Sequence, residues 1–151
     1  MKCCIIIPAR LASTRLPNKI LADIAGKPMI VRVYENALKA NCGDVYVATD
    51  SPEVVALIGA NAILTNPNLP SGTDRIHSAL LELEKQGKAY DIIINVQGDV
   101  PNISPEVIYE TKKLLEETKE ADITTPITKI KDEGKKAKTN VVKAVVSFTG
   151  K

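Results

Sequence analysis

Three short, almost entirely apolar runs constrain the fold of this chain more than any other feature of its sequence. They are Cys3–Ile7, Val45–Ala48 and Ile92–Val96. A strand that is apolar at nearly every position, rather than at every second one, is buried on both faces, as in a parallel sheet covered by helices. The sequence therefore predicts a parallel sheet at the centre of the molecule.

Segments with helical signals alternate with these runs. Pro28 is well placed at a helix start and is followed by apolar residues at helical spacing. Ser51 and Ser104 each precede a proline and a glutamate, which is typical of an N-cap and a first helical turn. A further helix is expected from Thr73 through Leu83. This repeated order predicts a doubly wound α/β fold, whose ligands bind outside the carboxyl ends of the strands.

Two weaker strands are expected toward the C-terminus, one within Asp122–Ile130 and one within Val141–Phe148. The lysine-rich stretch Lys129–Lys138 separates them, and we interpret it as a solvated loop rather than a binding patch. The chain has 151 residues, of which 44% are hydrophobic and 25% charged. These values predict one globular domain with a substantial core.

The composition argues against several functions. Twenty basic and 18 acidic residues give a net charge of only +2, and 3% of residues are aromatic, so a nucleic-acid partner is not expected. Three cysteines and one histidine suggest neither a zinc site nor a disulfide framework. We interpret Cys3 and Cys4 as small buried hydrophobes in a protein of the reducing cytoplasm, with a redox role as the alternative. The N-terminal apolar run is too short to span a membrane and lacks a signal-peptide cleavage region.

The segment that follows the first apolar run concentrates positive charge. Arg10, Arg15 and Lys19 lie within ten residues, together with two hydroxyl side chains. Arginine offers bidentate donors to phosphate oxygens and lysine offers a compact point charge. The segment matches neither common glycine-rich phosphate motif. We interpret it as a polyphosphate-binding loop in which side chains replace much of the backbone contact; the alternative is an ordinary basic surface loop.

An aspartate follows closely after each of the other two apolar runs. Asp50 follows Val45–Ala48 after one residue, and Asp99 follows Ile92–Val96 after Gln97 and Gly98. A carboxylate beside phosphate-binding cations suggests Mg²⁺, which combines one or two carboxylates with substrate phosphates and water. Asp99 is the first choice, although it could simply form a turn. Asp50 is the weaker candidate, because its position also suits a helix entry.

The segment 70–75 places small hydroxyl residues and a glycine at an expected helix N-terminus. Free N–H groups there favour anions or carbonyl oxygens, so the segment could hold a nucleobase or ribose. The alternative is that Thr73 only caps the helix while Arg75 points to solvent. We interpret His77, one step further, as structural rather than catalytic.

Five motifs in order along the chain together resemble a known family. They are Ile7–Lys19, Ala25–Ile30, Val47–Asp50, Ser71–Arg75 and Asn95–Asp99. With them the chain closely resembles the 3-deoxy-manno-octulosonate cytidylyltransferases, also called CMP-KDO synthetases. These enzymes transfer a cytidylyl group from CTP to the acid sugar KDO for lipopolysaccharide synthesis. The Ser71–Arg75 block favours KDO over the sialic acid relatives, and the resemblance spans nearly the whole chain.

The resemblance implies a Rossmann-like fold of the nucleotide-diphospho-sugar transferase type, with a mostly parallel sheet and helices on both faces. It implies that Arg10 and Lys19 bind the triphosphate and that Asp99 holds Mg²⁺, and these three are the expected catalytic residues. Ser13 and Arg15 would support the triphosphate loop. The cytidine site would be lined by Ala9, Ser71, Gly72, Thr73, Asp74, Arg75 and Gln97.

The chain departs from the family pattern in three ways. Asn18 stands where glycine is usual, and asparagine also tolerates a left-handed backbone. Val100 stands where a glutamate is usual, which removes a possible outer partner for the metal. Family members also continue well past Lys151, with most of the acid-sugar pocket, a second metal-binding aspartate and much of the homodimer contact.

Residues 1–151 are therefore expected to be the nucleotide-binding part of one cytidylyltransferase domain, truncated at its C-terminus. Two alternatives remain. One is a different nucleotidyltransferase, acting on sialic acid or using another nucleotide. The other is a non-catalytic nucleotide-binding module.

Overall fold

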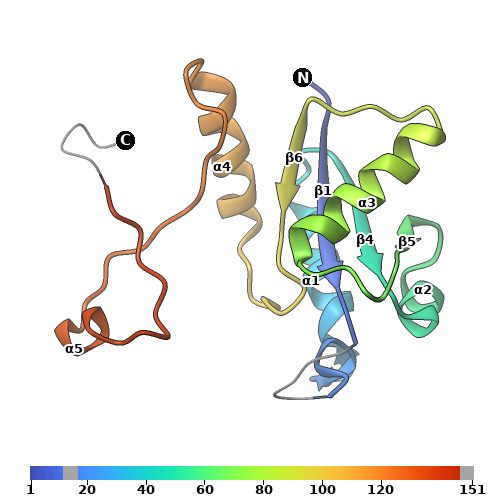
Figure 1. The fold of residues 1–151 in the computed structure, drawn as a ribbon, viewed down its shortest axis with the longest axis horizontal. Helices are drawn as coiled ribbons and strands as arrows, with labels where there is room; N and C mark the ends of the chain where they lie inside the picture. Colours follow the sequence, from blue (N-terminus) through green and yellow to red (C-terminus); the bar gives the residue numbers. More distant parts are fainter. Residues whose placement is uncertain (12–16, 147–151) are drawn as a thin grey trace.

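The computed structural model describes residues 1–11 and 17–146 and contains a four-stranded parallel sheet (Figure 1). The strand order is β5-β4-β1-β6. The strands are β1 (Cys3–Ala9), β4 (Asp44–Thr49), β5 (Ala62–Leu64) and β6 (Ile92–Asn95). All three strand pairs are parallel, so the four carboxyl ends meet at one edge of the sheet. The three predicted apolar runs are confirmed as β1, β4 and β6.

Helices cover both faces of this sheet, which confirms the predicted α/β class. Helix α3 (Gly72–Lys85) lies in front of the sheet in Figure 1 and α1 (Met29–Lys39) lies behind it. The α1 side also receives α2 (Pro52–Ile58) and α4 (Pro105–Glu117). Short 3₁₀ turns η1 (Lys19–Leu21) and η2 (Gly59–Asn61) complete the connections.

The alternation of side chains along β1 divides the core into two clusters. Ile5 and Ile7 point to the α1 side, where they pack with residues such as Val33. Cys4 and Ile6 point to the α3 side. All four are completely buried. Because successive strand residues face opposite sides, a strand with a helix layer on each side must be apolar throughout, as this sequence is.

Serine caps set the starts of two helices. The Ser51 Oγ accepts a hydrogen bond from the Val54 amide at 3.3 Å, and the Ser71 Oγ accepts one from the Asp74 amide at 3.1 Å. Helix α3 thus begins at Gly72 with Ser71 as its cap, and the alternative that Thr73 caps it is wrong. Ser104 occupies the N-cap of α4, but its hydroxyl contacts the Glu106 carboxylate instead of a backbone amide.

A two-stranded hairpin precedes α1 and was not predicted. It consists of β2 (Asp23–Ile24) and β3 (Lys27–Pro28). Ala25 and Gly26, with φ of 50° and 82°, form its turn. Two positive φ values match the type I′ turn that suits a tight hairpin.

The two weaker strands predicted toward the C-terminus are wrong for the residues that the structure describes. Residues 122–130 and 141–146 contain no strand there, and Phe148 lies outside the described ranges. In this region Ile123 and Val142 are 83% and 95% exposed, so their side chains are not packed into the core as those of a sheet strand would be. The chain after α4 leads away from the sheet in Figure 1.

The lysine-rich stretch lies in this C-terminal region. It is largely exposed, as predicted for a solvated segment, and contains the short helix α5 (Glu133–Lys136). Across residues 1–11 and 17–146, every helix is too short or too polar to cross a membrane.

Candidate functional site

The predicted site motifs converge on the end of β1. A Cβ added to Gly98 would lie 2.8 Å from the Pro8 carbonyl oxygen, and one added to Gly72 would lie 3.4 Å from the Pro8 Cγ. The turn after β6 and the first turn of α3 therefore both pack against this proline. Ala9 and Arg10 follow it directly, with Ala9 buried and Arg10 exposed. Three segments distant in sequence thus form one rim at the carboxyl ends of the strands.

Lys19 and Asp99 meet at this rim. The Lys19 ammonium donates a hydrogen bond to Asp99 Oδ2 at 2.7 Å, and the side chains are 37% and 49% exposed. The expectation that Asp99 lies beside the cations of the loop is confirmed for Lys19. A cation and an anion that touch and remain open to solvent can each exchange partners when a charged ligand arrives.

The backbone of Asn18 positions Lys19. Asn18 has φ 56° and ψ 26°, which is the left-handed helical region, and it precedes the 3₁₀ turn that begins at Lys19. Asparagine adopts this conformation more readily than most residues. The expectation that asparagine can replace glycine here is therefore confirmed for the local backbone.

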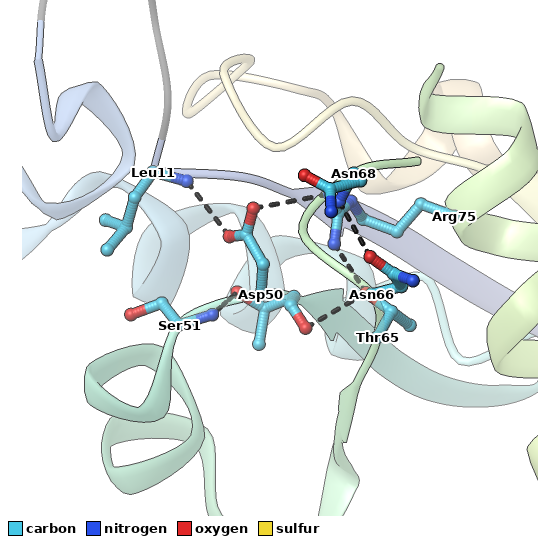
Figure 2. A network of polar contacts seen from close by, with 8 residues as sticks. Leu11, Asp50, Ser51, Thr65, Asn66, Asn68 and Arg75 are labelled. Carbon is cyan, nitrogen blue, oxygen red and sulfur yellow. Dashed lines mark hydrogen bonds and ion pairs between the residues drawn. The ribbon is translucent and has the colours of Figure 1, made fainter. Parts of the chain in front are cut away.

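Arg75 is not solvent-facing, so the alternative that it points outward is wrong. Its side chain is 2% exposed and pairs with the Asp50 carboxylate at 3.3 Å. Its Nη1 also donates to the Thr65 Oγ at 2.5 Å, and Asp50 Oδ1 accepts from the Leu11 amide at 3.2 Å (Figure 2). Asp50 therefore has partners within the protein on both carboxylate oxygens.

The remaining predicted residues lie around the rim with different exposures. Ser71, Thr73 and Asp74 are exposed in the first turn of α3, where the Ser71 hydroxyl also contacts the Asp74 carboxylate at 2.5 Å. Gln97 is exposed after β6, with its amide donating to Asn95 Oδ1 at 3.0 Å. Ser13 and Arg15 lie outside the described residues.

The Asp99 carboxylate is an exposed oxygen donor at the rim, where one of its oxygens accepts from Lys19. Within the described parts of the chain, no group of three or more histidine, cysteine or acidic side chains is arranged to hold a metal ion. A single exposed carboxylate still fits Mg²⁺, because that ion takes one or two carboxylates and completes its shell with phosphates and water. Val100, which replaces the usual glutamate, packs against the core instead.

A cavity of about 270 Å³ lies elsewhere, beside β5 and the end of α3. Its walls include Tyr46, Leu64, Leu83 and Lys88. Its lining includes none of the predicted site residues that the structure describes. The candidate site is therefore separate from this cavity.

Sequence reasoning missed the role of Asp50 as a buried link between segments. It treated Asp50 as a weak metal candidate or a helix entry. The signal in the sequence was a strand ending in a threonine and an aspartate, but the partner of that aspartate lies 25 residues away. Sequence alone does not show which distant cation meets a carboxylate.

A parallel α/β sheet that presents cations and a carboxylate at its carboxyl edge fits the class of Rossmann-like proteins that bind nucleotides. Within that class, the chain belongs to the cytidylyltransferase family. The family model described as cytidylyltransferase matches residues 4–151.

Named relatives of this chain point in the same direction. The 3-deoxy-manno-octulosonate cytidylyltransferase of Sinorhizobium medicae is 50% identical over 149 residues, which cover 97% of this chain and 59% of the relative. The corresponding protein of Brucella anthropi is 47% identical over 150 residues, with the same two coverages. The chain therefore spans 59% of the length of these two relatives.

A solved structure agrees with the fold. The structure of CMP:2-keto-3-deoxy-manno-octonic acid synthetase complexed with CTP superposes with a TM-score of 0.69 at 42% identity. The match covers 80% of this chain and 49% of that one. A nucleotidyl transferase from Methanothermobacter, at 22% identity and a TM-score of 0.59, shares the fold alone.

Proposed function

We propose that this chain forms the nucleotide-binding part of an enzyme that transfers a cytidylyl group from CTP to KDO, giving CMP-KDO and pyrophosphate for lipopolysaccharide synthesis. The observation that carries the proposal is the Lys19–Asp99 contact at the end of β1, beside the first turn of α3. It places a cation that suits a phosphate beside a carboxylate that suits a metal ion. The named relatives act on the same acid sugar, and the related solved structure holds CTP.

In this proposal Arg10 and Lys19 bind the triphosphate. A hydroxyl oxygen of the sugar attacks the α-phosphorus in line, the bond from that phosphorus to the β-phosphate oxygen breaks, and pyrophosphate leaves as the hydroxyl loses its proton. Negative charge grows on the phosphate oxygens as this happens. Lys19 can follow that charge as a compact cation, which is how such sites chiefly accelerate the transfer.

Asp99 would hold Mg²⁺ in the same site. The ion would neutralise phosphate charge. Lys19 would then leave Asp99 for a phosphate oxygen, and both groups are exposed enough to do so. Ser71, Thr73 and Gln97 present hydroxyl and amide groups that would recognise the base and ribose.

The setting of the reaction is part of the proposal. We place it in the cytoplasm, because Cys3, Cys4 and Cys42 are all free thiols. The full-length enzyme would act as a homodimer without a nucleic-acid or membrane partner. Residues past position 151 in the relatives would supply most of the acceptor pocket.

One assay separates this proposal from its alternatives. Pyrophosphate release is measured with each of the four nucleoside triphosphates, in the presence of KDO or sialic acid, using the full-length enzyme that carries this sequence. We expect turnover only with CTP and KDO. Turnover with sialic acid or with another nucleotide would favour a different nucleotidyltransferase, and a folded protein without turnover in any combination would favour the non-catalytic module.

A further inference from the structure

We propose that the buried Asp50–Arg75 pair is a positioning device that ties the start of the triphosphate loop to the first turn of α3. Arg75 would then act through Asp50 rather than by touching the nucleotide. The expected effect on ligand binding rests on the proposed function. The link from Arg75 through Asp50 to Leu11 can be tested without any ligand.

A continuous chain of hydrogen bonds carries the link (Figure 2). The Leu11 amide donates to Asp50 Oδ1 at 3.2 Å, and Arg75 Nη2 donates to Asp50 Oδ2 at 3.3 Å. Arg75 Nη1 donates to the Thr65 hydroxyl at 2.5 Å, and that hydroxyl donates to the Thr49 carbonyl at 3.0 Å. The ends of β1, β4 and β5 and the start of α3 are thereby joined.

The donor and acceptor groups in this series allow each hydrogen bond only one direction. A guanidinium has no acceptor, so the Thr65 hydroxyl must accept from Arg75 and use its only hydrogen for the Thr49 carbonyl. An ionised carboxylate can only accept, so both Leu11 and Arg75 must donate to Asp50. No bond in the series can reverse without breaking its neighbour, which makes the arrangement a single unit.

Burial keeps Arg75 away from a ligand in the open rim. Its side chain is 2% exposed and that of Asp50 is 8% exposed. A predicted site residue adjoins each end of this series of hydrogen bonds. Arg10 precedes Leu11, and Ser71 accepts the Arg75 amide at its carbonyl oxygen at 3.2 Å. A shift at Arg75 would therefore move the phosphate side and the base side together.

The first test measures amide hydrogen exchange of Leu11 by NMR in the ligand-free protein. Arg75→Met should speed Leu11 exchange by about tenfold or more, although Arg75 is hydrogen-bonded to Asp50 and not to Leu11, because Asp50 loses its anchor. Exchange at Val47, in the centre of the sheet, reports global stability, which should fall because the buried Asp50 carboxylate loses its partner. The local effect is therefore the increase at Leu11 beyond the increase at Val47. Glu82→Gln removes an exposed ion pair on the same helix and is the matched control.

The conservative variant guards against simple misfolding. Arg75→Lys keeps the charge but can serve Asp50 or Thr65, not both, because lysine lacks the planar fork. It should give an intermediate Leu11 exchange rate. Leu11 exchange equal to wild type in a folded Arg75→Met protein would overturn the link.

The second test compares binding of inorganic tripolyphosphate and of cytidine by calorimetry. If Arg75 positions the loop, Arg75→Met should weaken both by about tenfold, while Glu82→Gln leaves both unchanged. A loss for cytidine with unchanged tripolyphosphate binding would make Arg75 a direct base ligand and overturn the positioning role. A wild-type chain that binds neither probe would refute the proposed function and the binding consequence, while the Leu11 result would still decide the link.

Discussion

Lys19 and Asp99 form a 2.7 Å ion pair although they lie 80 positions apart in the chain. The pair joins the 3₁₀ turn after the cationic loop to the turn after β6. Because both side chains are partly exposed, the pair is open to competition from a charged ligand. In the proposed complex with a metal triphosphate, Lys19 would contact a phosphate and Asp99 would contact the metal ion, so the pair would have to separate.

The pair should contribute little to stability. Exposed ion pairs typically contribute about 0.2–1 kcal/mol, so Lys19→Ala should lower the free energy of unfolding by about 1 kcal/mol or less. Urea unfolding of Lys19→Ala beside Lys27→Ala checks this, since Lys27 forms a comparable exposed pair with Glu35. A loss of several kcal/mol for Lys19→Ala alone would mean that the pair holds the rim together.

The same residues should matter far more for turnover. In the full-length enzyme, Lys19→Ala and Asp99→Ala should each lower the rate about ten- to 150-fold, because a charge-assisted contact is worth about 1.5–3 kcal/mol. His77→Ala should have no comparable effect, since His77 is exposed on α3 and we assign it no catalytic role. Steady-state pyrophosphate release measures all three variants. Equal losses of turnover in all three variants would contradict the assignment of Lys19 and Asp99, and not His77, to the active site.

Gly98 should not tolerate a side chain. A Cβ there would lie 2.8 Å from the Pro8 carbonyl oxygen, so Gly98→Ala must shift the turn that carries Asp99. We expect a loss of about 1–3 kcal/mol in stability, as for other overpacked sites, and weaker nucleotide binding. Gly72→Ala is the comparison, because its Cβ would make an ordinary 3.4 Å contact with Pro8. Thermal unfolding that ranks Gly72→Ala as the more harmful change would contradict this packing.

The buried thiols predict a loss of stability at alkaline pH. Burial raises the pKa of Cys3 from 9.0 to about 11 and that of Cys4 from 9.0 to about 12. The folded state thus keeps these thiols protonated after the unfolded chain has begun to ionise. Their contribution is complete below pH 9 and declines as the pH rises through 9 toward 12.

Urea unfolding under reducing conditions tests this dependence. Between pH 9 and 10 each thiol should remove about 1 kcal/mol from the free energy of unfolding. Cys4→Ala should be less stable at pH 7 because it leaves a cavity, but should show a shallower decline over this interval. An unchanged slope in that variant would show that Cys4 is not the titrating group.

The sequence predicted the parts of the fold that depend on local pattern. Apolar runs gave β1, β4 and β6, because a strand buried on both faces must be apolar throughout. Ser51 was recognised as a helix cap from its neighbours alone. Placement of Lys19 and Asp99 on one rim followed from the rule that parallel strands share a carboxyl edge.

The remaining features depend on distant partners, which no local pattern reveals. The threonine- and isoleucine-rich segment within 122–130 has strand propensity, but a strand needs a neighbour and Ile123 is 83% exposed. The short edge strand β5 was missed because three residues carry too little pattern. Arg75 was placed at the nucleotide or in solvent because its pairing with Asp50 depends on how α3 packs against the sheet.

Titration calorimetry of the 151-residue chain with CTP and Mg²⁺ tests the central claim most directly. We expect weak binding at one site, reduced about tenfold or more in Lys19→Ala and unchanged in Lys27→Ala, because only Lys19 lies at the rim. Equal affinity in the wild type and Lys19→Ala, or no binding by a folded wild-type chain, would contradict the assignment of this rim as the CTP site.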